Sequence, residues 1–213
     1  MWSDQEMTTS IDHLVVAGTD LSALVAWWVA ASGQQPAVGG AHVGIGTKNA
    51  LVGLGSSYLE LVGPDPAQDE PPNPRPFGID DLPEHSIRFT TFALSVRDID
   101  EALDTMKSVG VKFGMANAMS REKPDGSVLS WRLALPAGYD GVMPFLIEWG
   151  PGAEHPSSSL DDGCEVVSIG GQHPEGELLA EALEALDAPC TVDVDPRPGL
   201  TAQLSTPKGT VEL

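Results

Sequence analysis

The stretch YLEL at residues 58–61 decides the fold, because its pattern, an apolar strand that carries a glutamate near its end, returns twice in the chain. The other copies are FLIEW at residues 145–149 and TVEL at residues 210–213. Each copy closes a segment that opens with a strand, runs through an amphipathic helix and returns through further strands. Since a repeat of this length usually governs the architecture, the sequence predicts three versions of one βαβββ unit.

The first repeat, residues 11–63, shows the pattern most clearly. It opens with the β-rich run IDHLVVAG at residues 11–18, after which Thr19 or Asp20 offers an N-cap for a helix. Gly33 is the expected end of this helix, and short strands are predicted over residues 41–46, 50–55 and 58–63. Apolar residues follow helical spacing on one stripe, at Leu21, Leu24, Val25, Trp28 and Val29.

The second and third repeats, residues 87–150 and 164–213, follow the same order. The second has an opening strand at 87–96, a helix between Asp98 and Gly110, strands at 113–121, 128–135 and 144–149, and a hairpin turn at 124–127. The third has an opening strand at 164–170, a helix with Pro174 in its first turn, and strands at 191–194, 200–205 and 210–213. Aligning the last hairpins of the first and third repeats places Glu212 opposite Glu60.

Proline-rich segments separate the repeats. Residues 64–86 hold seven prolines among acidic residues. Because proline removes ladder donors and disfavours helix, this segment is predicted to be an extended linker or lid. A similar but shorter linker covers residues 151–162.

The composition is strongly acidic, with 11 basic residues against 31 acidic ones and a net charge of −20. This charge repels nucleic-acid phosphates and anionic membranes, so both are excluded as partners. Residues 1–10 lack the pattern of a signal peptide, and the longest apolar helical run is too short to span a bilayer. Cys164 and Cys190 look like buried thiols in reducing surroundings. These features predict a cytoplasmic protein.

His13 is the sharpest candidate for chemistry. It shares a face of the opening strand with Ile11 and Val15, where a histidine needs a polar partner. Glu60, from the closing strand of the same repeat, is the natural partner, and Glu148 from the second repeat would supply a third ligand. One histidine and two carboxylates with open positions are typical of a catalytic divalent metal site. The alternative is a hydrogen-bonded core histidine with two carboxylates that meet solvent at strand ends.

A βαβββ unit with a histidine on its first strand and a glutamate on its last resembles the vicinal oxygen chelate superfamily, which includes glyoxalase I, extradiol dioxygenases and bleomycin-resistance proteins. More narrowly, IDHLVV at 11–16, GGAHVGIGTKNAL at 39–51 and YLELVG at 58–63 resemble its glyoxalase-like domain proteins. The resemblance covers residues 11–150 as a fold. It implies a cup of two repeats in which a substrate chelates a metal through adjacent oxygens, with His13, Glu60 and Glu148 as metal ligands.

The second repeat departs from the family pattern at Thr91. Counting back seven residues from the helix cap reaches His13 in the first repeat and Thr91 in the second, so the usual fourth metal ligand is a threonine here. Thr91 could orient water or substrate but would bind a borderline metal poorly. In the third repeat the same step lands on residues 166–168, so Glu212 has no histidine mate and is interpreted as a structural echo.

The glycine-dense segment GAHVGIGTKN at residues 40–49 gives a second site hypothesis. Glycines let a substrate approach the backbone, while His42 could act as a general base and Asn49 could hold a substrate oxygen. The alternative is a glycine-softened strand whose residues 47–49 form a hairpin turn. Trp131, on a predicted strand of the second repeat, is either a core residue or a wall of the cup that contacts substrate.

These observations predict an α+β protein of repeated βαβββ units that form cupped mixed sheets with helices on the outer face. Residues 11–63 and 87–150 would form the cup, and residues 164–213 would pack beside it or serve in a homodimer. The predicted function is a metal-assisted lyase, isomerase or dioxygenase of the glyoxalase-like kind, in which a divalent ion polarises a small-molecule substrate and Glu60 or His42 moves the proton. The alternatives are a non-catalytic protein that sequesters a small molecule and a degenerate member that uses its sheets for assembly.

Overall fold

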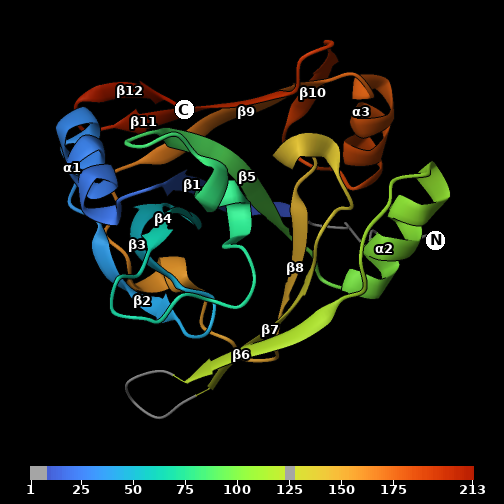
Figure 1. Cartoon of the computed structure of the whole chain (residues 1–213). Helices are drawn as coiled ribbons and strands as arrows, with labels where there is room; N and C mark the ends of the chain where they lie inside the picture. Colours follow the sequence, from blue (N-terminus) through green and yellow to red (C-terminus); the bar gives the residue numbers. More distant parts are fainter. Residues whose placement is uncertain (1–8, 123–127) are drawn as a thin grey trace. The chain divides into compact units, whose positions relative to one another are not determined.

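The computed structural model describes residues 9–122 and 128–213, and it contains the predicted element order three times (Figure 1). The first repeat comprises β1 (Ser10–Gly18), α1 (Leu21–Ser32), β2 (Ala37–His42), β3 (Thr47–Leu54) and β4 (Ser57–Pro64). The second comprises β5 (Ile87–Ser95), α2 (Ile99–Val109), β6 (Asn117–Glu122), β7 (Val128–Ala134) and β8 (Phe145–Trp149). The third comprises β9 (Glu165–His173), α3 (Gly176–Ala185), β10 (Thr191–Val194), β11 (Gly199–Thr206) and β12 (Gly209–Glu212). The α+β class and the repeated βαβββ order are confirmed, while the turn predicted at 124–127 lies outside the described residues.

The chain divides into two compact units, which we name after their helices. The α1 unit comprises His13–Thr91, Pro156–Ser168 and Leu200–Leu213. The α2 unit comprises Phe92–His155, Ile169–Gly199 and the described residues up to Asp12. The third repeat is therefore shared, because α3 and β10 belong to the α2 unit whereas β12 and nearly all of β11 belong to the α1 unit.

In the α1 unit, α1 covers one face of a sheet with the strand order β2-β3-β4-β1. The helix begins at its N-cap Asp20, whose carboxylate accepts hydrogen bonds from two backbone N–H groups, and it ends at Gly33 with a φ of 79°. Leu24 and Trp28 are fully buried. A side chain at Gly63 would lie 3.0 Å from the first residue of the helix, so this glycine lets α1 pack closely on β4.

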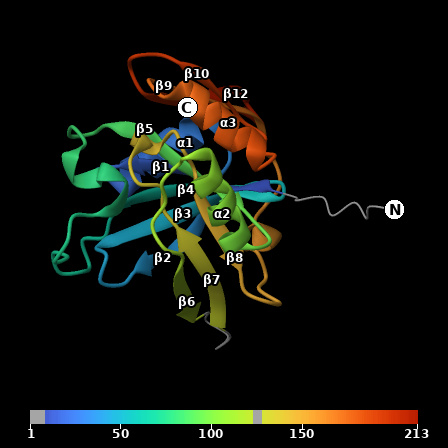
Figure 2. The ribbon, with the colours of Figure 1, turned by 90° about the vertical axis from the view of Figure 1, so that its right-hand side faces the viewer.

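In the α2 unit, the strands follow the order β5-β8-β7-β6, where β5 contributes its residues from Phe92 onward, and α2 lies alongside β8 (Figure 2). Asp98 caps the start of the helix as predicted, and Gly110 ends it in the left-handed conformation with a φ of 100°. Ile99, Ala102 and Met106 are buried on one stripe of α2. The first two repeats thus use the same helix signals, and these signals are local enough to be recognised in the sequence.

The third repeat keeps the element order but changes the strand pairing. In the first repeat the closing strand β4 pairs in parallel with the opening strand β1. In the third, β9 pairs in parallel with β10, and β12 pairs with β11 as an antiparallel hairpin. Glu212 is exposed on this hairpin, where it accepts a 3.5 Å hydrogen bond from Gln203. It is therefore not the spatial counterpart of Glu60.

Some predicted boundaries are wrong. The strand expected at residues 41–46 ends at His42, because Gly44 and Gly46 have φ values of 78° and 73° and the chain turns there. Pro174 precedes α3 instead of lying in its first turn. Short 3-10 helices occur at η1 (Pro76–Asp81), η2 (Tyr139–Gly141) and η3 (Pro156–Ser159), so both proline-rich segments contain a little regular structure.

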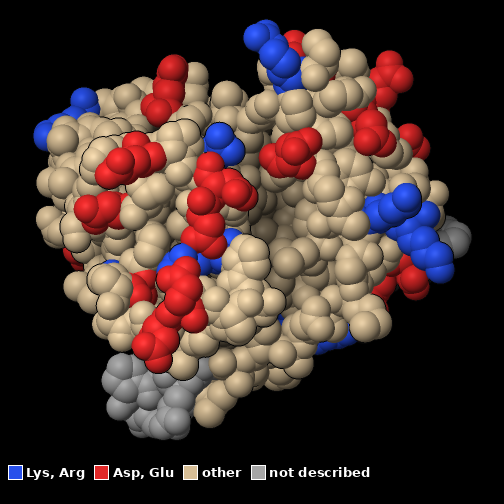
Figure 3. Space-filling view, viewed as in Figure 1, with Lys and Arg blue, Asp and Glu red and all other residues tan. Residues whose placement is uncertain are grey.

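Acidic side chains occur over much of the face shown in Figure 3, in keeping with the net charge of −20. Both cysteines are free thiols, and burial raises the pKa of Cys164 to about 11 and that of Cys190 to about 12. Within residues 9–122 and 128–213, no helix is long and apolar enough to cross a membrane.

Candidate active site

Six polar or aromatic side chains share the face of the α1 unit's sheet that points away from α1. The strand register pairs His13 with Tyr58 and His42 with Thr47. Paired residues on neighbouring strands lie on the same face, as do alternate residues along one strand. We call this the polar face, and its six residues are His13, His42, Thr47, Asn49, Tyr58 and Glu60.

Asn49 joins His42 to Glu60. Its Nδ2 donates a 2.6 Å hydrogen bond to Glu60 Oε1 and lies 3.2 Å from His42 Nε2. The other ring nitrogen, His42 Nδ1, lies 2.8 Å from Thr47 Oγ1. Glu60 Oε1 is also 3.6 Å from His42 Nε2. The four side chains therefore form one continuous hydrogen-bonded network across β2, β3 and β4.

The orientation of Asn49 fixes the protonation pattern of the network. Its Oδ1 accepts a 2.9 Å hydrogen bond from the backbone N–H of Gly40, so its amide nitrogen must face Glu60 and His42. An amide nitrogen can only donate, and His42 Nε2 must then be an acceptor without a proton. In the neutral form of the His42 ring, this geometry places the proton on Nδ1, which donates it to Thr47 Oγ1.

The network combines a buried acid with a reachable base. Asn49 and Glu60 are buried, whereas the His42 side chain is 27% exposed. A buried carboxylate on a strand is tolerated only with hydrogen-bond donors, and Asn49 is one such donor to Glu60. His42 is the member of the network that an entering molecule can contact.

Gly39 makes room for Asn49. A β-carbon at Gly39 would collide with Asn49 Oδ1 and would lie 2.7 Å from the Asn49 carbonyl oxygen. The register between β2 and β3 also shifts between Val38 and Ala41. This bulge turns the backbone N–H of Gly40 toward Asn49. The glycine-dense stretch thus supports the position of Asn49, and residues 47–49 lie in β3 and not in the hairpin turn that the alternative predicted.

His13 lies on the same face, on the neighbouring strand β1. Its ring stacks on that of Tyr58, with centroids 4.6 Å apart and planes 12° from parallel. His13 is buried, and its strand neighbour Val15 is paired with Glu60. The structure therefore brings His13 and Glu60 onto adjacent strands of one face, as the sequence predicts.

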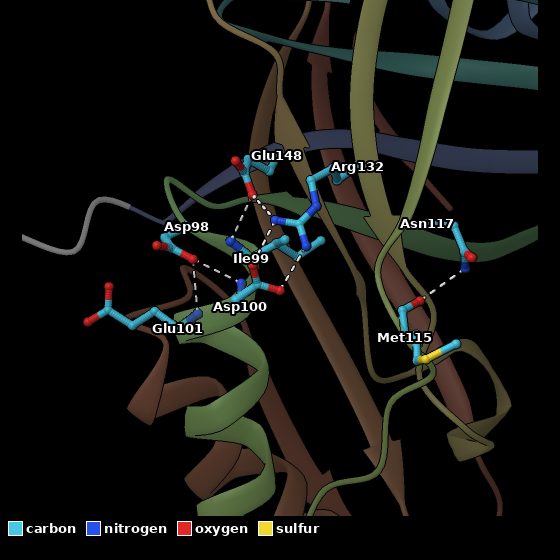
Figure 4. Close-up of polar contacts among 8 residues, drawn as sticks. All are labelled: Asp98, Ile99, Asp100, Glu101, Met115, Asn117, Arg132 and Glu148. Atoms are coloured by element: carbon cyan, nitrogen blue, oxygen red, sulfur yellow. Dashed lines mark hydrogen bonds and ion pairs between the residues drawn. The ribbon is translucent and has the colours of Figure 1, made fainter.

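Glu148 belongs to a different cluster, on the side of the α2 unit's sheet that faces α2 (Figure 4). Its Oε2 accepts a 3.0 Å hydrogen bond from the backbone N–H of Ile99, at the start of α2, and lies 3.3 Å from Arg132 Nη1. Arg132 also donates to both oxygens of Asp100, at 2.9 and 2.8 Å. These bonds hold the pKa of Asp100 below its usual value and raise the pKa of Arg132.

The contacts of Glu148 do not favour it as a third metal ligand. Glu148 is engaged by a cation and by a helix N-terminus, both of which disfavour an added metal ion. Within the part of the chain that the structure describes, no group of three or more His, Cys, Asp or Glu side chains is arranged to hold a metal. His13 and Glu60 remain two predicted ligands that lie on adjacent strands.

The two remaining predicted site residues lie in different compact units. Thr91 is a buried residue of β5 in the α1 unit. Trp131 is half-buried on β7 in the α2 unit, where its ring lies 5.7 Å from that of Trp149 on the adjacent strand β8. A role for either residue in substrate binding remains a prediction.

Two further sets of polar contacts in the α2 unit, one around Asp12 and one at His173, have no counterpart among the sequence predictions. Asp12 has a completely buried side chain, and its Oδ2 accepts a 2.7 Å hydrogen bond from Trp149 and lies 3.2 Å from His155 Nε2. His173 is buried and accepts a hydrogen bond at Nδ1 from the backbone of Glu175. His155 lies in a proline-rich linker and His173 just before a helix. Both positions are typical of exposed histidines, so the sequence carries no signal of their contacts.

Repeated βαβββ units with polar side chains on the sheet face opposite the helix agree with the fold that the resemblance to glyoxalase-like domain proteins implies. The chain belongs to the glyoxalase-like domain family, whose model matches residues 11–186. The match confirms the resemblance and extends it past the first two repeats into α3. No curated protein matches the chain.

Solved structures agree on the fold. A hypothetical protein from Staphylococcus aureus is 15% identical with a TM-score of 0.62, over 96% of this chain and 85% of that protein. A methylmalonyl-CoA epimerase from Mycobacterium tuberculosis is 17% identical with a TM-score of 0.46, over 71% and 93%. A hypothetical protein from Bacillus halodurans is 19% identical with a TM-score of 0.48, over 69% and 99%. The Staphylococcus aureus protein thus shares the fold of this chain.

Proposed function

We propose that the chain is a small-molecule isomerase or lyase that moves a proton at a carbon next to a carbonyl group, with His42 as the general base. The observation that carries this proposal is the single amide of Asn49, which contacts both His42 Nε2 and the buried Glu60. Apolar residues at these strand positions would be less costly to bury. A buried polar network of this kind is typical of a functional site.

The network supplies each element of a proton transfer. His42 Nε2 carries a free electron pair and takes the proton from the substrate carbon, and the electrons of the C–H bond move to the carbonyl oxygen. The imidazolium that forms keeps its Nδ1–H hydrogen bond to Thr47. Its positive charge is stabilised by the carboxylate of Glu60, whose Oε1 lies 3.6 Å from Nε2. Asn49, displaced from Nε2, then donates its N–H to the substrate oxygen.

The proton returns from His42 to a neighbouring carbon in an isomerase, or the electrons expel a leaving group in a lyase. A substrate with adjacent oxygens fits this chemistry, because the second oxygen acidifies the carbon and can accept a further hydrogen bond. The metal-assisted version of the reaction, including a dioxygenase, would need a third ligand beside His13 and Glu60. The contacts of Glu148 do not favour that version.

Deuterium exchange tests the proposal, because its readout is the same whichever product forms. The wild-type protein and His42→Gln are incubated in D2O with a panel of 2-oxoaldehydes, 2-hydroxyketones and 2-oxo acids, and exchange at the carbon is followed by proton NMR. We expect the wild type to exchange one class, and His42→Gln to lose about 10²- to 10⁴-fold in rate. Equal rates in the two proteins would contradict the assignment of His42.

A binding protein is the second candidate, and the paired aromatic rings favour it. In the α2 unit, the half-buried rings of Trp131 and Trp149 are tilted 48° to each other and give a planar compound an aromatic surface to contact. In the α1 unit, the buried rings of His13 and Tyr58 are stacked on each other. Such a protein would bind a panel member tightly in calorimetry yet give no exchange in D2O. Binding that survives in His42→Gln, together with no exchange in the wild type, would establish this candidate and remove the enzyme proposal.

A further inference from the structure

The proline-rich segment after β4 folds back on the turn that joins β2 to β3. We call residues 65–82 the strap and residues 43–46 the turn. The turn directly connects His42 to Thr47, and these two side chains share a 2.8 Å hydrogen bond. Strap and turn both belong to the α1 unit. The segment is therefore attached to the candidate site and is more than a spacer between repeats.

Gln68 connects the strap to the turn and to the first residue of β3 by hydrogen bonds. Its Oε1 accepts a 3.0 Å hydrogen bond from the backbone N–H of Gly44, and its Nε2 donates to the carbonyl of Thr47 at 3.3 Å. Nε2 also donates to Asp65 Oδ2 at 2.9 Å. Asp65, which is buried, donates its own N–H to the carbonyl of Gly46 at 2.9 Å. The side-chain amide of Gln68 thus supplies partners to backbone groups on both sides of the turn.

Arg75 is the second tie. Its Nε donates a 3.1 Å hydrogen bond to the carbonyl of Gly46, the same oxygen that Asp65 uses. Its guanidinium group forms ion pairs with Glu70 at 3.0 Å and with Asp80 at 2.7 Å, and the side chain is only 14% exposed. Arg75 therefore holds two parts of the strap together while it binds the turn.

The turn needs such support because its backbone is unusually free. Gly44 and Gly46 both have positive φ, and glycine loses more conformational entropy on folding than other residues. A β-carbon at Gly46 would lie 2.8 Å from Pro71, so the strap is packed directly on the turn. The turn itself contributes one backbone hydrogen bond, from Ile45 N–H to the carbonyl of His42 at 3.0 Å, beside the β2–β3 pairing of His42 with Thr47. The strap adds hydrogen bonds to Gly44, Gly46 and Thr47.

We infer that the strap is a positioning device for His42, and that Gln68 and Arg75 are the positioning residues that hold the ring in its Nδ1–H form against Thr47. Free histidine in water favours the opposite tautomer, with the proton on Nε2. The Nδ1–H tautomer assigned to His42 therefore needs Thr47 to be held in place as its acceptor. This inference deepens the proposed function, because His42 is its base. Its test reads the His42 ring directly and needs no substrate.

The test is a long-range 1H–15N NMR spectrum of the histidine rings, with His42 identified by its loss in His42→Gln. In the wild type at neutral pH we expect His42 to be protonated on Nδ1. In Gln68→Leu and Arg75→Ala we expect its nitrogen shifts to move toward the Nε2–H form or toward the average of the two. Arg75→Lys keeps the positive charge but loses the planar guanidinium group. Its His42 nitrogen shifts should lie between those of Arg75→Ala and those of the wild type.

His173 provides an internal reference, since its Nδ1 accepts a hydrogen bond from Glu175 and its ring is fixed as the Nε2–H form. The nitrogen shifts of His173 should be unchanged in every variant that folds. Gln203→Leu and Arg197→Ala are matched controls, because Gln203 is exposed and Arg197 is 87% exposed, and neither should move His42. An unchanged His42 spectrum in folded Gln68→Leu and Arg75→Lys would overturn the inference.

The two proposals can fail separately. If His42→Gln retains full deuterium exchange but the strap variants shift the His42 ring, the strap positions a histidine that is not the base. If exchange depends on His42 but the ring does not respond to the strap variants, the base assignment holds and the strap has no positioning role. If both proposals hold, the strap variants change the His42 nitrogen shifts and also lower the rate of deuterium exchange.

Discussion

At the scale of single residues, the candidate site depends on the position of the Asn49 side-chain amide. The sequence offers His42, Asn49 and Glu60 as candidates on three strands, but it cannot show that Asn49 joins the other two. That contact depends on the bulge in β2, where the backbone of Gly40 binds Asn49 Oδ1 at 2.9 Å. A bulge shifts the register by one residue and has no periodic signature in a glycine-rich segment.

Gly39→Ala tests this arrangement. Since a β-carbon at Gly39 would collide with Asn49 Oδ1, we expect the amide to be pushed from its place and exchange activity to fall to the level of Asn49→Ala. Overpacking of this kind costs about 1–3 kcal/mol in unfolding free energy. Gly114→Ala is the control, because its nearest contact would be an ordinary 3.7 Å. Full activity in Gly39→Ala, measured beside that control, would show that the position of Asn49 does not matter.

Glu148 shows why a residue pattern alone cannot settle the ligands. It matches Glu60 in the repeat, yet Glu60 points away from its helix whereas Glu148 accepts a hydrogen bond from the first residue of α2. Successive strand residues face opposite sides of a sheet. When the repeats are aligned on His13 and Thr91, Phe145 takes the place of Glu60 in the parallel strand pairing, so Glu148 lies three residues further on and faces the opposite side of the sheet. This odd-numbered shift is invisible in short apolar motifs.

At the scale of helices and strands, the sequence is most informative about helix ends. Asp20, Gly33, Asp98 and Gly110 all act as predicted, because capping uses local contacts of residues a few positions apart. The predicted position of β2 is wrong by several residues, since the run of glycines from 39 to 46 contains both strand and turn. Which glycine turns the chain depends on the strap, which lies further along the sequence.

The helix cap of α2 gives a stability prediction. Asp98 accepts hydrogen bonds from the backbone N–H groups of Asp100 and Glu101 at 3.0 and 3.1 Å. Asp98→Ala should lower the unfolding free energy by about 1 kcal/mol, as measured by urea denaturation. Asp104→Ala removes an exposed carboxylate from the same helix and should have a smaller effect. Equal losses in both variants would mean that Asp98 acts through general charge and not through its cap.

The cluster around Arg132 gives a pH prediction for the α2 unit. Because hydrogen bonds from Arg132 lower the pKa of Asp100 below its usual 3.8, the bonds stabilise the folded state above that value and are lost as the pH falls through the lowered pKa. Arg132→Gln should therefore be less stable than the wild type at pH 7, and the difference should shrink in strong acid. Lys107→Gln is the control for lost charge. A difference between wild type and Arg132→Gln that is the same at both pH values would contradict the assignment.

At the scale of the whole molecule, three copies of one element order do not make three equivalent units. The order is readable in the sequence because each helix has its own apolar stripe. The sequence does not show that β9 pairs with β10 and β11 with β12, because strand partners in the third repeat depend on contacts between distant segments. The division of this repeat between two compact units is a property of packing that no short motif encodes.

Metal dependence is the broadest question about the molecule as a whole. With Glu148 bound to Arg132 and Ile99, we expect exchange activity to survive prolonged dialysis against a chelator, with the metal content followed by elemental analysis of the same samples. Activity that disappears with a divalent ion, returns on its addition, and is lost in parallel with the ion in His13→Ala and Glu60→Ala would replace the proposed mechanism with the metal-assisted one. His85→Asn, at an exposed histidine, controls for adventitious metal binding.

The rate of deuterium exchange in the wild type, His42→Gln and His85→Asn, measured on the same substrate, is the measurement that decides whether His42 is the base. We expect the rate to fall by about 10²- to 10⁴-fold in His42→Gln. It should be kept in His85→Asn, because His85 is an exposed histidine outside the network. A rate that persists in folded His42→Gln would contradict the assignment.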